Sequence, residues 1–533
     1  MVAPPGCGKT ELLAQRADRL IEALLPHQRI LALTFSNRAK ANLDERLLTV
    51  MGTERKRRHV TVRNFHGHAA EILRSHGRTL ALDPAFTMPG KRTQSSAVEP
   101  YVEGLSDADA GRLRERIETD LRTPKQRPYS DAQVLAWLHE QGIEPSTEIE
   151  TARQASATLF YDDLLRHAQR LLRVPEIAFL YQNHYGAVLV DEFQDLSPQQ
   201  LDIALRSCSR SRTFVGDPLQ GIYSWTGARP VQVERQLRRI CGEPEGLGVS
   251  YRSSPHVLTL LNAVAATLGG QPLAPDDPGA WFEGGITAGT RFATGQEEAD
   301  FLVETAARIL DRQASSTIGV ISRSEWRRKP VDKAFSDSPL VVCQWDLAVD
   351  NPEIVRLLRD TAAKLGQDYD LNSLRSEVEA QVDPADAETQ ADIGEAFIEI
   401  ERLTAALGGA ASALAQLRDP DDDDASIGPG VHLLNAHTGK GQQFDWVFMP
   451  GIEKGHIPSF LAKPSEMDEE RRILLVMFSR ARHGVVLTRA DSLISKKGNP
   501  YPTDGSPWLS DLVPALSARR EALCAHIDRL PSN

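Results

Sequence analysis

The 533-residue sequence has few cysteines and no long hydrophobic run. Its five cysteines are scattered and never spaced as C-x-x-C: Cys7, Cys208, Cys241, Cys343 and Cys524. This spacing argues against a disulfide framework and against a zinc or iron–sulfur site. No apolar stretch approaches the roughly 18–20 residues of a membrane span. The first residues lack the basic and apolar segments of a signal peptide. We therefore expect a cytoplasmic protein.

A net positive charge is also missing. The chain has 61 basic and 73 acidic residues, a formal net charge of −12, which argues against a purely electrostatic nucleic-acid binder. The charge is uneven, however. Acidic residues without any Lys or Arg fill the stretch between Arg375 and Arg402, and "RKRRH" stands at 55–59. A local groove can therefore still be positive.

Short apolar runs that end in a polar turn recur along the chain, and most are separated by stretches with helical spacing of apolar residues. The runs lie at 29–35, 187–193, 212–218, 316–323, 339–345, 446–451 and 484–490. Strands alternating with helices predict an α/β fold with parallel sheets covered on both faces. The polar stretches 75–155 and 346–418 are predicted to be helical insertions, and "DPDDDDASIGPG" at 419–430 is typical of a solvated linker.

The stretch "APPGCGKT" at the start of the chain matches the phosphate-binding pattern G-x-x-x-x-G-K-[ST], except that Ala3 replaces the first glycine. Gly6 and Gly8 would let backbone N–H groups turn toward a phosphate. Lys9 would neutralise the outer phosphates, and the Thr10 hydroxyl would bind Mg²⁺. An ordinary glycine-rich turn is the alternative.

A second acidic motif, "AVLVDEFQD", carries two carboxylates to the end of a predicted buried strand. Ligands bind at this end of the strands in α/β sheets. Asp191 would hold Mg²⁺, and Glu192 would orient and deprotonate an attacking water. Neighbouring side chains on a strand point to opposite faces, so both acids can serve one site only where the strand ends.

Together with these motifs, the order of further blocks resembles UvrD/Rep-type superfamily 1A DNA helicases. The blocks are "LALTFSNRAKANLDERL", "RNFHGHAAEILR", "LFYDDLLRHAQRLL", "VLVDEFQDLSPQQ", "FVGDPLQGIYSWTGA", "GVSYRSSPHVL", "LNAHTGKGQQFDWVFMPGIEKGHIP" and "DEERRILLVMFSRAR". The resemblance implies two RecA-like P-loop NTPase domains with ATP and Mg²⁺ between them, single-stranded DNA across their tops, and 3′→5′ movement.

The resemblance also implies roles for individual residues. Gln220 would sense the γ-phosphate, and Arg252 and Arg480 would act as arginine fingers; surface ion pairs are the alternative for both arginines. The residues expected to bind the nucleotide are Ala3, Pro4, Pro5, Gly6, Cys7, Gly8, Lys9, Thr10, Tyr251, Arg252, Gln443 and Arg480.

In this family, DNA bases stack on aromatic rings, and such stacking tolerates any base sequence. The matching residues here are Phe35, Asn37, Phe65, His66, Tyr223, Trp225 and His437. A place in the hydrophobic core is the alternative for Phe65 and Tyr223. The basic run at 55–58 would either contact phosphates or form a solvated loop.

The resemblance implies six segments. They are 1–74 and 156–245 for the first RecA-like domain, 75–155 for its helical insertion, 246–345 and 431–533 for the second RecA-like domain, and 346–430 for a reduced acidic insertion with its linker.

Four departures from the family pattern stand out. Glu11 replaces an arginine that sandwiches adenine, Thr226 replaces an arginine, and Gln443 replaces a glutamate near the ribose. The strand and the glutamine segment that usually precede the phosphate loop are also missing. Either the sequence is truncated, which we favour, or a neighbouring segment replaces the strand.

We expect an ATP-dependent helicase or translocase in DNA repair, recombination or defence, acting on single-stranded DNA or on junctions. The alternative is an ATP-gated DNA sensor that controls a partner nuclease and unwinds little.

Overall fold

The computed structural model describes residues 1–86, 93–142, 144–224, 227–345, 352–366, 369–382, 427–495 and 498–532, with scattered positions between 393 and 414. These residues form two compact units. Unit 1 comprises Met1–Val2, Lys9–Pro218 and Tyr223–Gly246, and unit 2 comprises Ala3–Gly8, Leu219–Ile222 and Leu247–Asn533. The mixed α/β class expected from the sequence is confirmed, whereas the six segment boundaries stay predictions.

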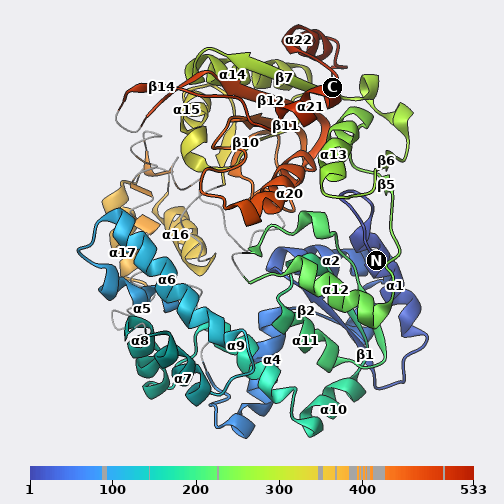
Figure 1. The fold of residues 1–533 in the computed structure, drawn as a ribbon, viewed down its shortest axis with the longest axis vertical. Helices are drawn as coiled ribbons and strands as arrows, with labels where there is room; N and C mark the ends of the chain where they lie inside the picture. Colours follow the sequence, from blue (N-terminus) through green and yellow to red (C-terminus); the bar gives the residue numbers. More distant parts are fainter. Residues whose placement is uncertain are drawn as a thin grey trace. The chain divides into compact units, whose positions relative to one another are not determined.

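Unit 1 is built on a four-stranded parallel sheet in the order β2-β1-β3-β4. Figure 1 labels β1 and β2 of this sheet. The strands are β1 (Arg29–Thr34), β2 (Val60–Asn64), β3 (Tyr185–Val190) and β4 (Ser211–Phe214). The central strands β1 and β3 are almost wholly buried, as their apolar runs predict. Because the strands are parallel, the residues that follow β1, β3 and β4 gather at one edge of the sheet.

Helices cover both faces of this sheet. On one face, α4, α9, α11 and α12 enclose a core that includes Leu31, Leu33, Val188 and Val190. On the other, α1 contacts β1 and β3 and packs against α2. The helices of the sheet domain are α1 (Lys9–Ile21), α2 (Asn37–Met51), α3 (Thr53–His59), α4 (Phe65–His76), α9 (Tyr161–Leu171), α10 (Pro175–His184), α11 (Pro198–Ser207) and α12 (Pro230–Cys241).

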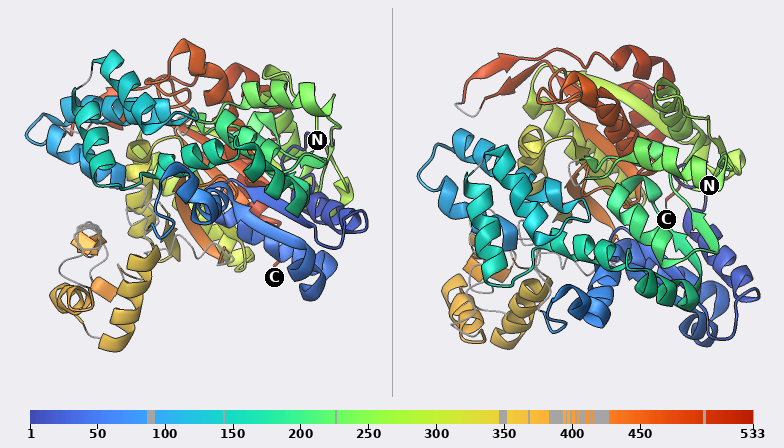
Figure 2. Two further views of the ribbon diagram at one scale, coloured as in Figure 1. Left: turned by 90° about the horizontal axis from the view of Figure 1, so that it is seen from below. Right: turned by 60° about the horizontal axis from the view of Figure 1, so that its bottom comes forward.

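The predicted helical insertion in unit 1 is confirmed as helical. It contains α5 (Thr93–Val102), α6 (Asp107–Lys125), α7 (Asp131–Gln141) and α8 (Glu144–Ala155). These helices gather in one group in both views of Figure 2, where they are blue to teal. They share a small core of their own, to which Ile117, Leu121 and Val134 contribute.

A buried ionic cluster joins this insertion to the sheet domain. The Nζ atom of Lys125 on α6 lies 2.9 Å from Glu150 Oε2 and 3.1 Å from Asp163 Oδ2 on α9, and all three side chains are fully buried. Arg166 donates to Asp163 at 2.6 Å. Burial alone would raise the pKa of Asp163, but the charges of Lys125, Arg166 and Arg153 outweigh it and lower that pKa. The cluster therefore remains charged and fixes α6 and α8 to α9.

Unit 2 contains a six-stranded parallel sheet in the order β7-β12-β11-β8-β10-β9. Its strands are β7 (Ile286–Phe292), β8 (Thr317–Ser322), β9 (Val342–Gln344), β10 (Gly430–Asn435), β11 (Phe444–Pro450) and β12 (Ala481–Ala490). Four of them match predicted runs, and β7 and β10 were not predicted. Smaller pairs are β5 (Val249–Ser250) with β6 (Ala274–Pro275), and β13 (Ser492–Ile494) with β14 (Pro500–Pro502).

The helices of unit 2 are α13 (Pro255–Thr267), α14 (Gly295–Arg312), α15 (Glu325–Ser336), α16 (Pro352–Leu365), α17 (Leu371–Glu379), α20 (Met467–Phe478), α21 (Leu509–Leu512) and α22 (Arg520–Asp528). The helices α16 and α17 confirm the helical prediction for the start of the second insertion. Most of the predicted linker, 419–426, lies outside the described residues. In the described part of the chain, no helix has the length and apolar character needed to cross a membrane.

The substitution Lys125→Met should destabilise unit 1 by about 3–5 kcal/mol, because it removes one of the buried cations that neutralise the carboxylates of Glu150 and Asp163. The matched control on the same helix is Arg116→Met, which removes an exposed partner of Asp120; its expected cost is about 0–1 kcal/mol. Urea unfolding monitored by circular dichroism measures both losses. Equal losses in the two variants would contradict a stabilising role for the cluster.

Candidate active site and nucleic-acid interface

The phosphate loop turns at two glycines with left-handed backbone. Gly6 and Gly8 both have φ of 77°. A Cβ atom on Gly6 would lie 2.6 Å from Arg252 Cβ and 2.6 Å from Ser250 Oγ. Only glycine therefore allows this approach between the loop and the segment after β5. Within unit 2, the predicted phosphate loop and the predicted arginine finger Arg252 therefore lie close together in space.

A backbone hydrogen bond fixes the same approach. The Tyr251 N–H donates to the Gly6 carbonyl oxygen at 2.9 Å. The Tyr251 side chain is 65% exposed, so its ring is available to a ligand. Gln443 is also exposed. Within the loop, Ala3 and Cys7 are buried.

Lys9 and Thr10 begin α1, so the loop ends at a helix N-terminus, a favourable place for an anion. Lys9 Nζ lies 3.9 Å from Glu192 Oε1. The structure therefore brings together the cation of the loop and the predicted general base.

The two acids lie directly after β3, as the sequence predicts. Glu192 has a left-handed backbone (φ 52°) and accepts a hydrogen bond from the Gln194 side chain. Asp191 is buried and accepts from the Glu192 N–H at 2.9 Å. Burial, followed by the charge of Glu192, raises the pKa of Asp191 to about 7. A nearby cation would favour the charged form of this carboxyl.

The donors at this place fit Mg²⁺. Among the described residues, no three His, Cys, Asp or Glu side chains cluster as a metal site. Mg²⁺ commonly uses only one or two carboxylates together with substrate phosphates and water. Thr10 at the helix start and Asp191 at the strand end supply oxygen atoms of that kind.

The two predicted arginine fingers converge on Ser479. Arg252 Nη1 donates to the Ser479 carbonyl oxygen at 3.4 Å, and Arg480 Nη2 donates to its hydroxyl at 2.6 Å. Arg480 Nη2 also lies 3.4 Å from Gln220 Oε1. The arginine and the predicted γ-phosphate sensor are therefore in direct contact.

Two further cations hold the segment that carries Gln220, and the sequence analysis missed both. Lys440 Nζ donates to the Gln220 carbonyl oxygen at 2.8 Å, and Arg472 Nε donates to that of Gly221 at 2.9 Å. Both lie in motif blocks that were recognised without assigning these residues. A cation that bonds a backbone carbonyl leaves no pattern by which the sequence alone could identify it.

Two aromatic pairs mark the candidate DNA surface of unit 1. Phe35 and Tyr223 stack with ring centroids 5.5 Å apart and an interplanar angle of 17°. His66 stacks on Tyr161 at 3.9 Å. Tyr161 was not predicted, although it lies in the block "LFYDDLLRHAQRLL". Flat rings of this kind can accept unpaired bases.

The other predicted DNA contacts have different outcomes. Phe65 is fully buried in the core of unit 1, so the core alternative applies and we leave it out of the DNA surface. In unit 2, burial and then the charge of Arg323 lower the pKa of His437 to about 4, which keeps its ring neutral near pH 7. Trp225 and Thr226 lie outside the described residues, as does the Asn37 side chain.

Two charged features have local partners in unit 1. The basic run at 55–58 forms part of the helix α3, so the loop alternative is wrong and contact with phosphates stays a prediction. Within this run, Arg55 pairs with Asp18 and Lys56 with Asp44. Glu11, which replaces an arginine of the family pattern, pairs with Arg46 on α2.

Known DNA helicases are similar to this chain in sequence. Residues 1–239 match the UvrD/REP helicase N-terminal domain, and residues 357–492 match the UvrD-like helicase C-terminal domain. DNA helicase II of Rickettsia typhi is 23% identical, over 92% of this chain and 90% of the relative. The ATP-dependent DNA helicase PcrA of Leuconostoc citreum is 24% identical, over 97% and 83%. PcrA of Staphylococcus aureus is 23% identical, over 97% and 84%.

The substitution Gly6→Ala should weaken nucleotide binding about tenfold or more. A non-glycine residue at positive φ costs about 1–3 kcal/mol, and contact with Arg252 adds to that cost. A suitable control is Gly52→Ala, because Gly52 has φ of 76° but no atom within 4 Å of its added Cβ. Titration with a fluorescent ATP analogue measures the effect. Equal affinity of the Gly6→Ala variant and the wild type would show that this close approach is dispensable.

Proposed function

The chain belongs to the UvrD/Rep-type family of DNA helicases, and from this premise we propose that it is an ATP-dependent motor that moves 3′→5′ on single-stranded DNA. The observation that carries the proposal is the pairing of Lys9 with Glu192 at 3.9 Å, beside the buried Asp191. A phosphate-neutralising cation and a base for water at one helix start are the groups that ATP hydrolysis needs.

Each group has a distinct role in hydrolysis. Lys9 neutralises the β- and γ-phosphates, while the backbone N–H groups around Gly6 and Gly8 surround them. Glu192 accepts a proton from the attacking water, and the hydrogen bond from Gln194 orients its carboxylate. Thr10 and Asp191 would hold Mg²⁺, which neutralises charge on the phosphate oxygens.

The two arginines supply positive charge where negative charge develops in the transition state. The planar guanidinium groups of Arg252 and Arg480 offer fixed forks of N–H donors for the γ-phosphoryl oxygens. Their shared partner Ser479 holds them in one place, and close packing of Arg252 on Gly6 ties one of them to the loop. This arrangement supports an arginine-finger role for both residues.

Gln220 links nucleotide chemistry to DNA in this proposal. Its side chain contacts Arg480, and Lys440 holds its backbone. Tyr223 follows three residues later in the chain and stacks on Phe35. A change at the γ-phosphate would move this short segment and thereby change the grip on a stacked base, which gives directed stepping.

Two substitutions test the chemistry directly. Lys9→Ala should abolish DNA-stimulated ATP hydrolysis. Glu192→Gln should lower the hydrolysis rate by about 10²-fold or more while nucleotide binding persists, because it removes the base and keeps the shape. The control Lys463→Ala removes a lysine whose side chain is 77% exposed, and its hydrolysis rate should equal that of the wild type. Release of phosphate with saturating single-stranded DNA is the measurement. Undiminished hydrolysis in Lys9→Ala would refute the assignment.

A second candidate function is an ATP-gated DNA sensor that controls a partner nuclease. The feature that favours it is the short distance along the chain between Arg252 and His437, which leaves room only for a reduced second insertion. A reduced insertion gives less surface for regulating strand separation. As a sensor, the protein would recognise junctions between single- and double-stranded DNA.

Strand displacement distinguishes the two functions. We expect the wild-type protein with ATP to release a labelled strand from a duplex with a 3′ single-stranded tail, and not from a duplex with a 5′ tail. Glu192→Gln is the matched control and should release neither. DNA-stimulated hydrolysis without displacement of any strand would favour the sensor, and release from the 5′-tailed duplex alone would contradict the polarity.

A further inference from the structure

A groove lined by basic side chains lies beside β2, the strand at one end of the unit 1 sheet. It has a volume of about 490 Å³, and residues of α2, α3 and β2 line it together with the first residue of β1. The volume lies within the range of about 300–1,000 Å³ that is common for ligand sites. The charged side chains in its lining are one acid, Asp44, and five bases, Arg29, Lys40, Lys56, Arg57 and Arg63. We call this space the basic groove.

Most of the positive charge in the basic groove has no acidic partner. Lys56 pairs with Asp44, and Arg63 forms an exposed pair with Glu71, a type of pair that contributes little. The other three bases form no ion pair within the described part of the chain. Burial, followed by the charges of neighbouring arginines, lowers the pKa of His59, the residue before β2. The basic groove is therefore positive although the whole chain is acidic, with a formal net charge of −12.

Arg29 occupies the hydrogen-bond acceptors at one end of the basic groove. Its guanidinium group donates to Thr61 Oγ1 at 2.9 Å and, at distances of 2.6–2.9 Å, to the carbonyl oxygens of Arg57, Arg58 and Val60. Carbonyl oxygens without a donor would repel an anion at this place. Because all of these acceptors are neutral, they leave the positive charge of Arg29 uncompensated.

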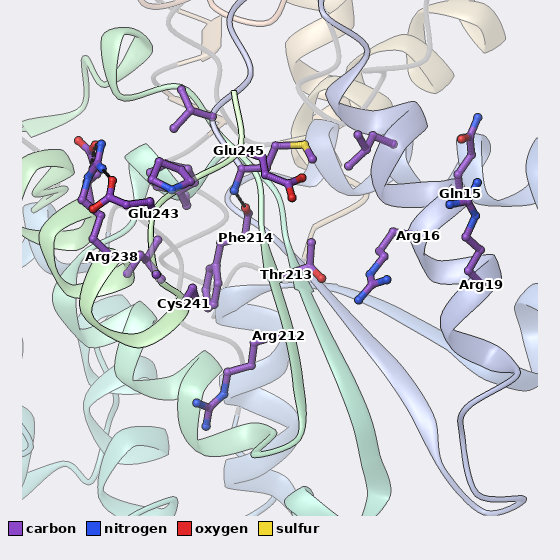
Figure 3. A pocket seen from close by; sticks show the side chains of 18 residues that line it. Gln15, Arg16, Arg19, Arg212, Thr213, Phe214, Arg238, Cys241, Glu243 and Glu245 are labelled. Carbon is purple, nitrogen blue, oxygen red and sulfur yellow. Dashed lines mark hydrogen bonds and ion pairs between the residues drawn. The ribbon is translucent and has the colours of Figure 1, made fainter. Parts of the chain in front are cut away.

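The cavity beside β4 differs from the basic groove in the balance of its charges (Figure 3). Three carboxylates line that cavity, and two of them, Glu234 and Glu243, pair with Arg238. The basic groove has one carboxylate in its lining, and Lys56 neutralises it. Of the two spaces, the basic groove is therefore the one whose charge favours an anionic ligand.

The basic groove leads away from the stacked rings of unit 1. Arg63 on β2 pairs with Leu33 on β1, and each strand ends one residue later. Phe35 and His66, one from each stacked pair, follow the ends of these strands. Arg29 begins β1, so it lies about 13 Å from Leu33 at roughly 3.3 Å per residue. A DNA strand that leaves the rings beside Arg63 can therefore extend along the groove toward Arg29.

The lining of the groove favours a nucleic-acid backbone over an acidic protein segment. Protein partners bury apolar anchors as well as charges. Val60 and Val62 are already buried, which leaves Leu48, 37% exposed, as the apolar side chain that the lining offers. Phosphate oxygens need N–H donors and positive charge, and Lys and Arg supply both.

We propose that the basic groove binds successive phosphates of single-stranded DNA where the strand leaves the stacked rings of unit 1. This inference rests on the proposed function, because it requires bases on Phe35 and His66. The backbone holds the side chain of Arg29, so Lys40 and Arg57 are the bases that donate to the phosphates. Contacts of this kind hold a strand without reading its sequence, as movement along any DNA requires.

The salt dependence of DNA binding tests the proposal, measured by fluorescence polarisation with the full chain and a fluorescein-labelled oligothymidylate. The double variant Lys40→Ala, Arg57→Ala removes two phosphate contacts. The slope of log affinity against log salt should therefore fall in magnitude by about 1.4, at about 0.7 per contact with a single strand, and affinity at low salt should fall about tenfold or more. Alanine is the strongest helix former, so the variant should keep its fold.

Two control variants separate the groove from charge in general. Arg55→Ala, Arg239→Ala removes the same charge from exposed positions of α3 and α12 outside the groove, and Arg55 already pairs with Asp18. The slope of this control should equal that of the wild type. Lys40→Arg, Arg57→Lys keeps both charges in the groove and should keep the slope as well.

Four outcomes would each overturn the proposal. Equal slopes in the wild type and in Lys40→Ala, Arg57→Ala would do so and leave the proposed function standing, whereas absence of DNA binding by the wild type would refute both. An equal fall in the Arg55→Ala, Arg239→Ala control would assign the loss to overall charge. Binding of fluorescein-labelled hexaglutamate that the groove variant loses, with its DNA affinity unchanged, would assign the groove to an acidic protein segment.

Discussion

The arrangement of the candidate site depends on the close approach of Gly6 to the segment after β5. A single Cβ atom at Gly6 would collide with Arg252 and Ser250, and the Tyr251 N–H bonds the Gly6 carbonyl oxygen. These contacts give the loop its fixed turn and place Arg252 beside it. Lys9, three residues further along, begins α1 and faces Glu192. The loop thus connects the residues proposed to bind phosphate with those proposed to act on it.

The polar groups of the site are held by partners of their own. Glu192 is bonded by Gln194, Arg480 by Ser479 and Gln220, and the backbone of Gln220 by Lys440. Such support orients catalytic groups before a substrate binds, which is where most electrostatic catalysis originates. Outside the site, the buried ion pairs of Lys125 fix the helical insertion to α9.

Burial alone does not decide which strands the sequence predicts, because the mostly buried β10 was missed whereas the half-buried β4 and β9 were predicted. The runs that became β1 and β3 are apolar throughout, because both faces of these strands are covered. The strand β2 alternates buried with half-buried residues and was missed. The residues of the candidate site were proposed from the motifs, because phosphate chemistry requires particular groups at fixed spacing, and their roles stay predictions.

Contacts between distant residues could not be predicted in this way. The bond from Lys440 to Gln220 and the stacking of Tyr161 on His66 join residues far apart in sequence. Phe65 shows the opposite error. It was predicted as a DNA contact with the hydrophobic core as the alternative, and it is buried in the core that also contains Leu31 and Leu33.

The central claim is that nucleotide chemistry at Lys9 and Glu192 is coupled to a strand held by stacked rings. The most direct test is the steady-state ATPase rate of the wild-type protein with and without single-stranded DNA. The account predicts a slow basal rate that rises severalfold as DNA saturates the protein. Hydrolysis that is absent in both conditions, or that is indifferent to DNA, would contradict it.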